Sequence, residues 1–192
     1  MRTDRVKNHF EEEAKEYDLI IQNLIPNYNE MIESLVSIIP FSEETAFSMI
    51  DLGCGTGTIS KSVKARFPKA NVTCVDIAEK MLEIAKVKIG GDAILINADF
   101  NEFEFPHQYD LIVSSLALHH LETDNDKRAF YRKIFSSLAQ GGAFINIDVV
   151  LGSDDNVFCK EILAQAICYS LYFLIFQNYP IHIFKMAFVI CC

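Results

Sequence analysis

Short apolar segments alternate with longer amphipathic segments through the middle of this chain. Strands are expected where the apolar segments lie, at residues 48–52, 71–75, 93–97, 109–114 and 143–150. Helices are expected between them, where apolar residues recur at helical spacing, at residues 57–67, 79–88 and 125–139. Near-continuous apolar strands separated by amphipathic helices predict a doubly wound α/β fold, with a mostly parallel sheet covered by helices on both faces.

The N-terminal part is expected to be helical before this alternation begins. One amphipathic helix is predicted from His9 to about Leu24, because its apolar residues share one face and Pro26 follows as a stop signal. A second helix is predicted from about Met31 to Ile39.

The C-terminal tail departs from the alternating pattern. Residues 166–192 carry one formally charged side chain, Lys185, and the apolar run at 162–176 is too short for a comfortable membrane span. One interpretation is a shortened antiparallel hairpin around Pro180. The other, which we favour, is a truncated or frame-altered gene with a non-native end, because a solvent-facing segment should not be this apolar. We therefore divide the chain into a core at 1–150 and an atypical tail at 151–192.

The most informative motif joins the first expected strand to the next helix. Residues 51–57 read D-L-G-C-G-T-G, and Thr58 stands where the dinucleotide fingerprint places its third glycine. The phosphate-binding P-loop is excluded as well, because no Lys-Ser or Lys-Thr pair follows the glycines. Asp76 ends the second expected strand, where an acid can accept hydrogen bonds from both ribose hydroxyls. These features predict a ligand with a ribose but without a demanding phosphate, such as an adenosine joined to an amino acid.

Several segments in this order resemble the class I S-adenosylmethionine-dependent methyltransferases, which have a Rossmann-like fold. The segments are D-L-G-C-G-T-G at 51–57, V-D-I at 75–77 with M-L at 81–82, N-A-D-F at 97–100, Y-D-L-I-V-S-S at 109–115, L-H-H-L at 118–121 and G-G at 141–142. The resemblance covers about residues 10 to 150. In addition, residues 24–28 look like the corresponding segment of the carboxy-S-adenosylmethionine synthases and their methyltransferase relatives.

The resemblance implies S-adenosylmethionine as the cofactor and assigns one group of residues to its methionine end. Gly53 and Gly55, with Cys54 between them, would let backbone groups approach the cofactor. Asp51 would help to orient the amino end, although a simple turn carboxylate is the other interpretation. Ser115 would present an acceptor to the ammonium group, in a position where the synthases are expected to carry Asn. The synthases are also expected to carry Ser-Leu where this chain has Gly-Thr at 55–56, which favours ordinary methyl transfer.

A second group is assigned to the nucleoside end by the same resemblance. Asp76 would hold the ribose hydroxyls, while it could also cap the following helix, and Ile77 would cover the adenine. Asp99 and Phe100 would meet the adenine edge through a carboxylate and a backbone amide. Tyr28 matches a cofactor-contacting tyrosine of the synthase group, and a core tyrosine is the alternative.

No catalytic residue is assigned from the sequence. His119 and His120 follow the fourth expected strand, and histidine can act as a base near neutral pH. A structural role in packing the turn is nevertheless the favoured interpretation. A metal site formed with Asp124 or Asp126 is not expected, because no helical ligand pair is present.

Composition narrows the class of protein further. A length of 192 residues suits one domain, and a net charge of −9 argues against a nucleic-acid partner. The six cysteines show neither metal spacing nor a compact disulfide pattern, and no secretory signal is visible, so a cytoplasmic location is expected. An exposed apolar tail could serve homodimerisation.

Three hypotheses remain at this point. The first is an enzyme that transfers a methyl group from S-adenosylmethionine to an unidentified small-molecule acceptor. The second is a non-catalytic S-adenosylmethionine-binding protein or a truncated, inactive relative of the methyltransferases. The third and weaker one is a nicotinamide-binding oxidoreductase, which Thr58 disfavours.

Overall fold

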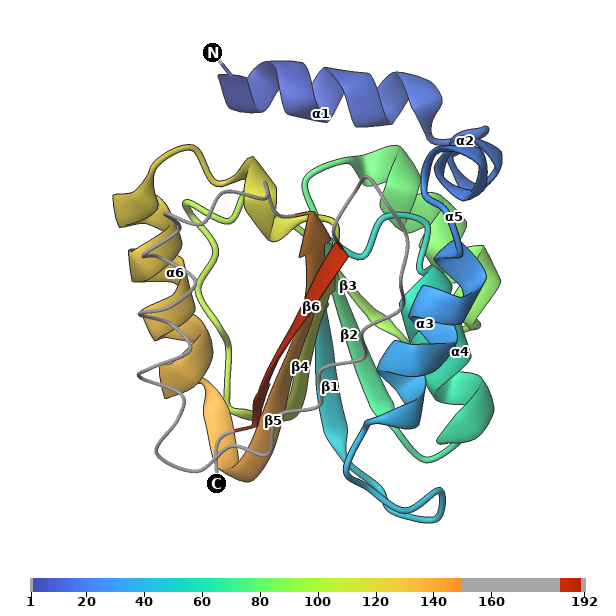
Figure 1. Ribbon diagram of the computed structural model, residues 1–192, viewed down its shortest axis with the longest axis vertical. Coiled ribbons are helices and arrows are strands. Elements are labelled where there is room, and N and C mark those ends of the chain that lie inside the picture. Colours follow the sequence, from blue (N-terminus) through green and yellow to red (C-terminus); the bar gives the residue numbers. More distant parts are fainter. Residues whose placement is uncertain (1, 150–183, 191–192) are drawn as a thin grey trace.

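The computed structural model describes residues 2–149 and 184–190, which form one six-stranded sheet flanked by helices (Figure 1). The strand order is β3-β2-β1-β4-β5-β6, in which β1 to β5 run parallel and β6 runs antiparallel to β5. The predicted doubly wound, mostly parallel α/β fold is therefore confirmed. The strands are β1 (Ser48–Leu52), β2 (Asn71–Asp76), β3 (Ile94–Asn97), β4 (Tyr109–Ser115), β5 (Leu138–Val149) and β6 (Phe184–Ile190).

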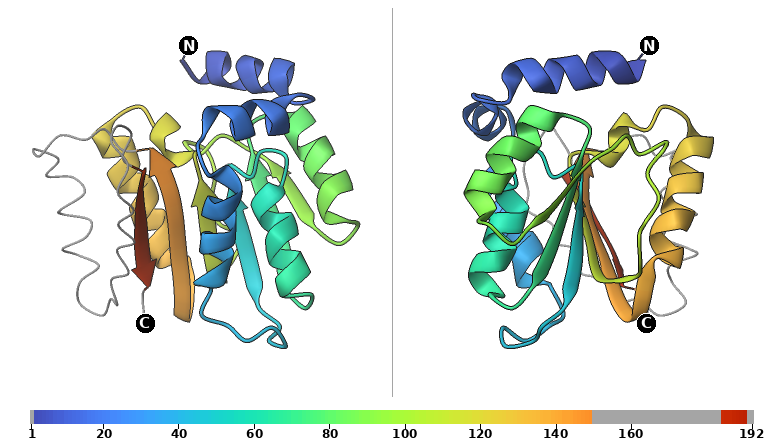
Figure 2. Two further views of the ribbon diagram at one scale, coloured as in Figure 1. Left: turned by 45° about the vertical axis from the view of Figure 1, so that its right-hand side comes forward. Right: turned by 180° about the vertical axis from the view of Figure 1, so that it is seen from behind.

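Helices cover both faces of the sheet, and α1 crosses above the carboxyl ends of the parallel strands (Figures 1 and 2). On one face lie α3, α4 and α5, and on the other lies α6. The helices are α1 (Arg2–Glu13), α2 (Tyr17–Leu24), α3 (Tyr28–Ser37), α4 (Thr58–Arg66), α5 (Glu79–Ile89) and α6 (Asp124–Ser136), with a short 3-10 helix η1 (Leu118–His120).

Alternating side chains of the central strands build two separate cores. Met49 on β1 packs into the core shared with α3, α4 and α5, whereas Ile50 and Leu52 pack into the core shared with α6. Because both faces of these strands are covered, nearly every position must be apolar. This burial explains why the strands are visible as continuous apolar segments in the sequence.

The N-terminal helix predicted from His9 to Leu24 is in fact two helices, which is a correction to the sequence analysis. A turn at residues 14–16 separates α1 from α2, and Ala14 in this turn is buried against Ala78 and Met81. The chain bends there because α1 crosses the sheet edge while α2 packs beside the glycine-rich loop. The apolar periodicity continues through the bend, since both helices bury one face, and it therefore gave no sign of the break.

Two other helix boundaries also differ from the predictions. The last helix was expected to reach residue 139, but α6 ends at Ser136. It ends there because the Ser137 carbonyl accepts the backbone N–H of Tyr109 at 2.8 Å, which begins the pairing with β4. β5 consequently starts at Leu138, before the glycine pair at 141–142. The helix expected from Met31 begins earlier, at Tyr28, directly after a left-handed residue at 27.

One strand of the tail completes the described sheet. β6 pairs with β5 from Ala143 opposite Ile190 to Val149 opposite Phe184. The apolar run at 162–176 and the turn predicted around Pro180 lie outside the described residues. Among the residues described, no helix has the length and apolar character needed to cross a membrane.

Candidate functional site

A cavity that is partly open to solvent lies at the carboxyl edge of the sheet. Its walls come from the segments that follow β1, β2, β3 and β4, with further side chains from α1, α2 and η1. In open α/β sheets this edge is where ligands bind, beside the point where the strand order reverses. Here the order reverses between β1 and β4, so the cavity lies where the fold favours a site.

The glycine-rich loop forms one wall, and its shape requires glycine. Gly53 has φ +69°, and a Cβ atom there would lie 2.3 Å from the Cβ of Ala117. The backbone N–H groups of Gly53 and Cys54 both donate to the carbonyl of Val75, at 2.8 and 3.0 Å, so the loop is held over the end of β2. A larger residue at position 53 would therefore close the space between the loop and the segment after β4.

Asp76 lies within hydrogen-bond distance of this loop. One of its carboxylate oxygens accepts the N–H of Gly55 at 2.8 Å, and the other accepts the N–H of Ala78 at 2.9 Å. Burial raises the pKa of Asp76, although these backbone donors partly offset the effect. The helix-capping alternative is wrong, because the N-cap residue of α5 is Ala78, whose own N–H Asp76 accepts.

The next wall comes from the turn after β3, where Asp99 and Phe100 lie. One oxygen of Asp99 accepts both the backbone N–H and the side-chain amide of Asn101, each at 2.9 Å. Phe100 packs against Phe130 with ring centroids 4.9 Å apart. The arrangement leaves the second carboxylate oxygen of Asp99 without a described protein donor, in a residue that lines the cavity.

Seven of the ten predicted cofactor residues line the cavity, and three do not. Those that line it are Gly53, Gly55, Asp76, Ile77, Asp99, Phe100 and Ser115. The other three, Tyr28, Asp51 and Cys54, are buried behind the loop or in the core.

Each of the three buried residues has its own environment. Asp51 accepts a hydrogen bond from the Ser60 hydroxyl at 2.7 Å, and burial raises the pKa of Asp51 to about 7. Tyr28 packs on α3, where burial raises its pKa to about 12. The Cys54 thiol donates to the carbonyl of Gly55 at 3.4 Å.

Several cavity residues were missed by the sequence analysis. Val6 and Phe10 from α1 and Tyr17 from α2 line the cavity, and Phe10 packs edge-on against Tyr17 with centroids 5.9 Å apart. The apolar face of this region was predicted, but periodicity alone does not tell whether such a face covers a core or a ligand site. Asn97 does not line the cavity, but its amide donates to the carbonyls of Asp76 and Ile77 at 3.0 and 2.9 Å and so supports the wall that these two residues form.

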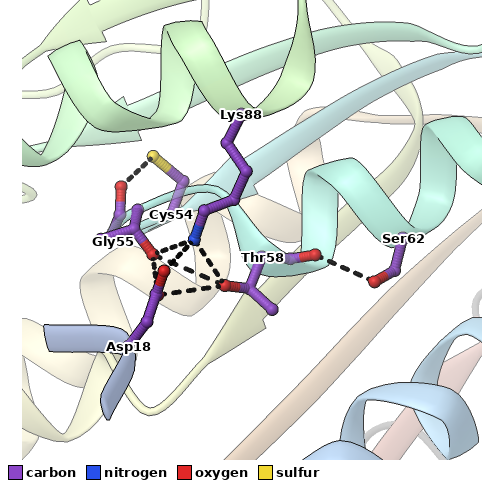
Figure 3. Close-up of polar contacts among 7 residues, drawn as sticks. Asp18, Cys54, Gly55, Thr58, Ser62 and Lys88 are labelled. Atoms are coloured by element: carbon purple, nitrogen blue, oxygen red, sulfur yellow. Dashed lines mark hydrogen bonds and ion pairs between the residues drawn. The ribbon is translucent and has the colours of Figure 1, made fainter. Parts of the chain in front are cut away.

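A polar cluster joins α2, the glycine-rich loop and α5 (Figure 3). The Lys88 ammonium lies 2.6 Å from an Asp18 carboxylate oxygen and 2.7 Å from the Thr56 hydroxyl. It also donates to the Thr58 hydroxyl at 3.1 Å. Burial alone would raise the pKa of Asp18, but the hydrogen bonds from Lys88 and Thr56 and the charge of Lys88 lower that pKa below its ordinary value.

The two candidate histidines differ in their surroundings. His119 Nδ1 lies 2.6 Å from an Asp148 carboxylate oxygen, and its backbone N–H donates to the other oxygen at 3.0 Å, so η1 is tied to the end of β5. His120 lines the cavity and packs edge-on against Phe10 at 5.5 Å. Within residues 2–149 and 184–190, no group of His, Cys, Asp and Glu is placed to hold a metal ion.

Comparison with known proteins gives consistent matches over the same region. Residues 49–142 match the family described as "Methyltransferase domain". A malonyl-[acyl-carrier protein] O-methyltransferase of Priestia megaterium is 30% identical over 141 residues, which are 73% of this chain and 49% of that protein. An uncharacterized methyltransferase of Bacillus cereus is 29% identical over 147 residues, 76% of this chain and 68% of that protein. The chain thus spans about half the length of the first of these relatives.

Solved structures share the fold. The DhpI–SAH complex matches with a TM-score of 0.65 and 20% sequence identity. The match covers 78% of this chain and 70% of the DhpI chain. A second match is the N-methyltransferase NodS of Bradyrhizobium japonicum WM9, in complex with S-adenosyl-L-homocysteine. It has a TM-score of 0.64 at 20% identity, and the match covers 73% of this chain and 71% of the NodS chain. At these identities the likeness concerns the arrangement of helices and strands.

Proposed function

We propose that this chain, which belongs to the class I S-adenosylmethionine-dependent methyltransferase family, binds S-adenosylmethionine in the cavity at the carboxyl edge of its sheet. The observation that carries the proposal is the junction of Gly55 and Asp76, whose N–H and carboxylate lie 2.8 Å apart in the wall of one cavity. A single small molecule can therefore touch both the bare loop and the acid.

The cavity offers separate places for the two ends of the cofactor. The ribose would lie against Asp76, because a carboxylate has about four lone-pair sites and the backbone donors do not occupy all of them. The adenine would lie between Ile77 and Phe100, with its exocyclic amine near Asp99. The methionine end would then extend along the loop at Gly53 toward Ser115.

Charge also supports a cationic ligand. Asp76, Asp99 and Glu122 contribute carboxylates to the described lining, and that lining contains no Lys or Arg. A cavity with carboxylates of one sign raises the local concentration of a cation. S-adenosylmethionine carries a sulfonium, whereas nucleotides with several phosphates would be repelled.

For methyl transfer from this cofactor, the main task of the protein is to position the cofactor and the acceptor relative to each other. When bound, the cofactor supplies a methyl group activated by its sulfonium, and the thioether that leaves is neutral. The chain's own residues would hold the cofactor in one orientation, and Phe10 and Tyr17 would exclude water from the cavity. Correct placement of two reactants contributes several kcal/mol to lowering a barrier, on the order of 7–11 kcal/mol in the best cases.

We further propose that the methyl acceptor is a small molecule, either free or attached to a carrier. The name of the Priestia megaterium relative supports a carrier-linked acid in that protein, and the name of NodS supports an amine nitrogen. The Gly-Thr pair at 55–56 supports methyl rather than carboxymethyl transfer. The synthase-like segment at residues 24–28 forms part of α2 and α3 and the turn between them, away from the lining of the cavity.

Calorimetry with S-adenosylhomocysteine tests the proposal. The wild-type chain should bind, and Asp76→Ala should weaken binding at least about tenfold, because a hydrogen bond to a charged group contributes about 1.5–3 kcal/mol. Asp92→Ala is the control, since it removes the same charge from an exposed side chain. Melting curves for both variants show whether Asp76→Ala still folds.

Two results separate the remaining alternatives. Equal binding by wild type and Asp76→Ala would remove Asp76 from the site. Binding without transfer of a radiolabelled methyl group to any acceptor in a panel of amines, alcohols and acids would favour the binding-only hypothesis.

A further inference from the structure

We infer that Lys88 and Asp18 are positioning residues for the cofactor site: their ion pair fastens α2 to the glycine-rich loop and thereby holds Tyr17 over the cavity. The inference rests on the proposed function. Neither residue lines the cavity, so each would act through the groups that it holds in place.

The pair is built into three elements at once. Lys88, near the end of α5, contacts Asp18 on α2 and the hydroxyls of Thr56 and Thr58 around the loop (Figure 3). The Thr56 hydroxyl in turn donates to the other Asp18 oxygen at 2.5 Å. The Lys88 side chain is 17% exposed and that of Asp18 is 41% exposed, so the pair is partly buried and is screened less than a fully exposed pair.

The ion pair controls the position of a cavity residue. Tyr17 precedes Asp18 in α2, and its ring lies 3.7 Å from where a Cβ atom of Gly55 would stand. It is therefore placed directly over the loop that also donates to Asp76. If α2 moved away from Lys88, Tyr17 would leave the cavity and lose its edge-on contact with Phe10.

A second anchor lies at the opposite end of α5. The Glu11 carboxylate on α1 accepts the backbone N–H of Glu79 at 2.7 Å and that of Lys80 at 3.3 Å. A carboxylate at a helix N-terminus is favourable because it satisfies free N–H groups and complements the helix dipole. Residues 2–24, which we call the N-terminal cover, are thus fixed at both ends of α5. Phe10 lies next to the Glu11 anchor, and Tyr17 lies next to the Asp18 anchor.

This arrangement links retention of the cofactor to the Lys88 anchor. α5 begins just after Asp76, and its far end carries Lys88, so one rigid helix connects the ribose-binding acid to the cover. Phe10 and Tyr17 of the N-terminal cover line the cavity that holds Asp76 and the loop, so a ligand seated there would contact the cover. Release would then require the cover to lift, which breaks the contacts of Lys88.

The decisive experiment measures the dissociation rate of S-adenosylhomocysteine by surface plasmon resonance. Lys88→Met should raise this rate about tenfold or more, because it removes the charge-assisted hydrogen bonds that hold α2 against the loop. Lys86→Met is the matched control, since Lys86 is an exposed lysine on the same helix, and its rate should stay within about twofold of wild type. The double variant Asp18→Lys, Lys88→Asp should restore much of the slow release.

Other measurements separate positioning from simple loss of stability. All rates are taken at a temperature where melting curves show every variant folded, because a purely stabilising pair would shift the melting temperature and leave the rate unchanged. Hydrogen exchange on the protein without ligand should be faster at residues 17–24 in Lys88→Met than in Lys86→Met. A wild-type dissociation rate in folded Lys88→Met overturns the inference. If the wild type binds no cofactor, the proposed function fails, and unchanged exchange at residues 17–24 would then overturn the anchor itself.

Discussion

Asp51 lies beneath the glycine-rich loop, where a serine hydroxyl is its described side-chain partner. The carboxyl group has lost nearly all contact with water, and this burial raises its pKa to about 7, against about 3.9 in an unfolded chain. The folded protein therefore keeps a proton that the unfolded chain releases above about pH 4. As a consequence, the free energy of unfolding should fall as the pH rises from about 4 to about 7, by an amount on the order of a few kcal/mol.

Asp51→Asn tests this pH dependence, because the amide does not titrate. Urea unfolding at pH 5 and pH 8 should show a smaller loss of stability in the variant than in the wild type. Some slope should remain, since burial raises the pKa of Asp76 in the same direction. The exposed variant Asp92→Asn should keep the wild-type slope, and an identical slope in Asp51→Asn would contradict the assignment.

The contact between His119 and Asp148 leads to a second expectation for a single residue. Asp148 is buried and receives both the imidazole and the backbone N–H of His119. Asp148→Asn should lower the free energy of unfolding by about 1–3 kcal/mol, because the amide replaces one charged acceptor by a donor. Chemical denaturation measures the change, and a difference below about 0.3 kcal/mol would show that the contact contributes little.

Residues that lie at or just after the end of a strand could be predicted to line the cavity. For residues inside a strand, the side chain's direction depends on its place in the strand's alternation. Asp76 is the last residue of β2 and Asp99 follows β3, and both residues line the cavity. Asp51 lies inside β1 on the same face as Met49, which packs toward α4, so strand alternation directs its side chain to Ser60. The motif predicted a segment that borders the cavity, but the alternation of side chains along β1 decides which of them face the cavity and which face the core.

At the scale of elements, buried strands were the easiest to predict and the N-terminal helices the hardest. The bounds of β1 agree with the predicted residues 48–52, because a strand covered on both faces leaves a continuous apolar segment. The division between α1 and α2 depends on contacts with α5, which begins more than fifty residues later in the chain. Local periodicity contains no information about such distant contacts.

The packing of α4 on α5 depends on a residue just before α4. Gly57 has φ +79°, and a Cβ atom there would lie 2.8 Å from Cδ1 of Ile89 and 3.1 Å from Cα of Ala85. Gly57→Ala should therefore destabilise the fold by about 1–3 kcal/mol through backbone strain and overpacking. Thermal unfolding measures the loss, and adding Ile89→Val should recover a part of it by removing the Cδ1 atom. Full wild-type stability in Gly57→Ala would mean that α5 moves aside freely.

At the scale of the whole molecule, the alternating pattern predicted the topology, and the strand order then determined where the cavity lies. The sequence could not show that residues 2–24 contribute side chains to this cavity, because their position depends on contacts with both ends of α5. The expectation that nucleic acid is not a partner stays a prediction from the net charge of −9. The expectation of a homodimer concerns a tail that falls mostly outside the described residues.

The hydrogen bonds of the glycine-rich loop have a consequence for ligand discrimination. Gly53, Cys54, Gly55 and Gly57 all donate their backbone N–H groups to acceptors within the protein. Loops that hold ATP or a dinucleotide instead direct such donors at phosphate oxygens. Because the loop N–H groups are already bonded within the protein, the pocket should not bind these phosphate-bearing metabolites even where they are abundant in a cell. A positively charged ligand would then meet little competition from them.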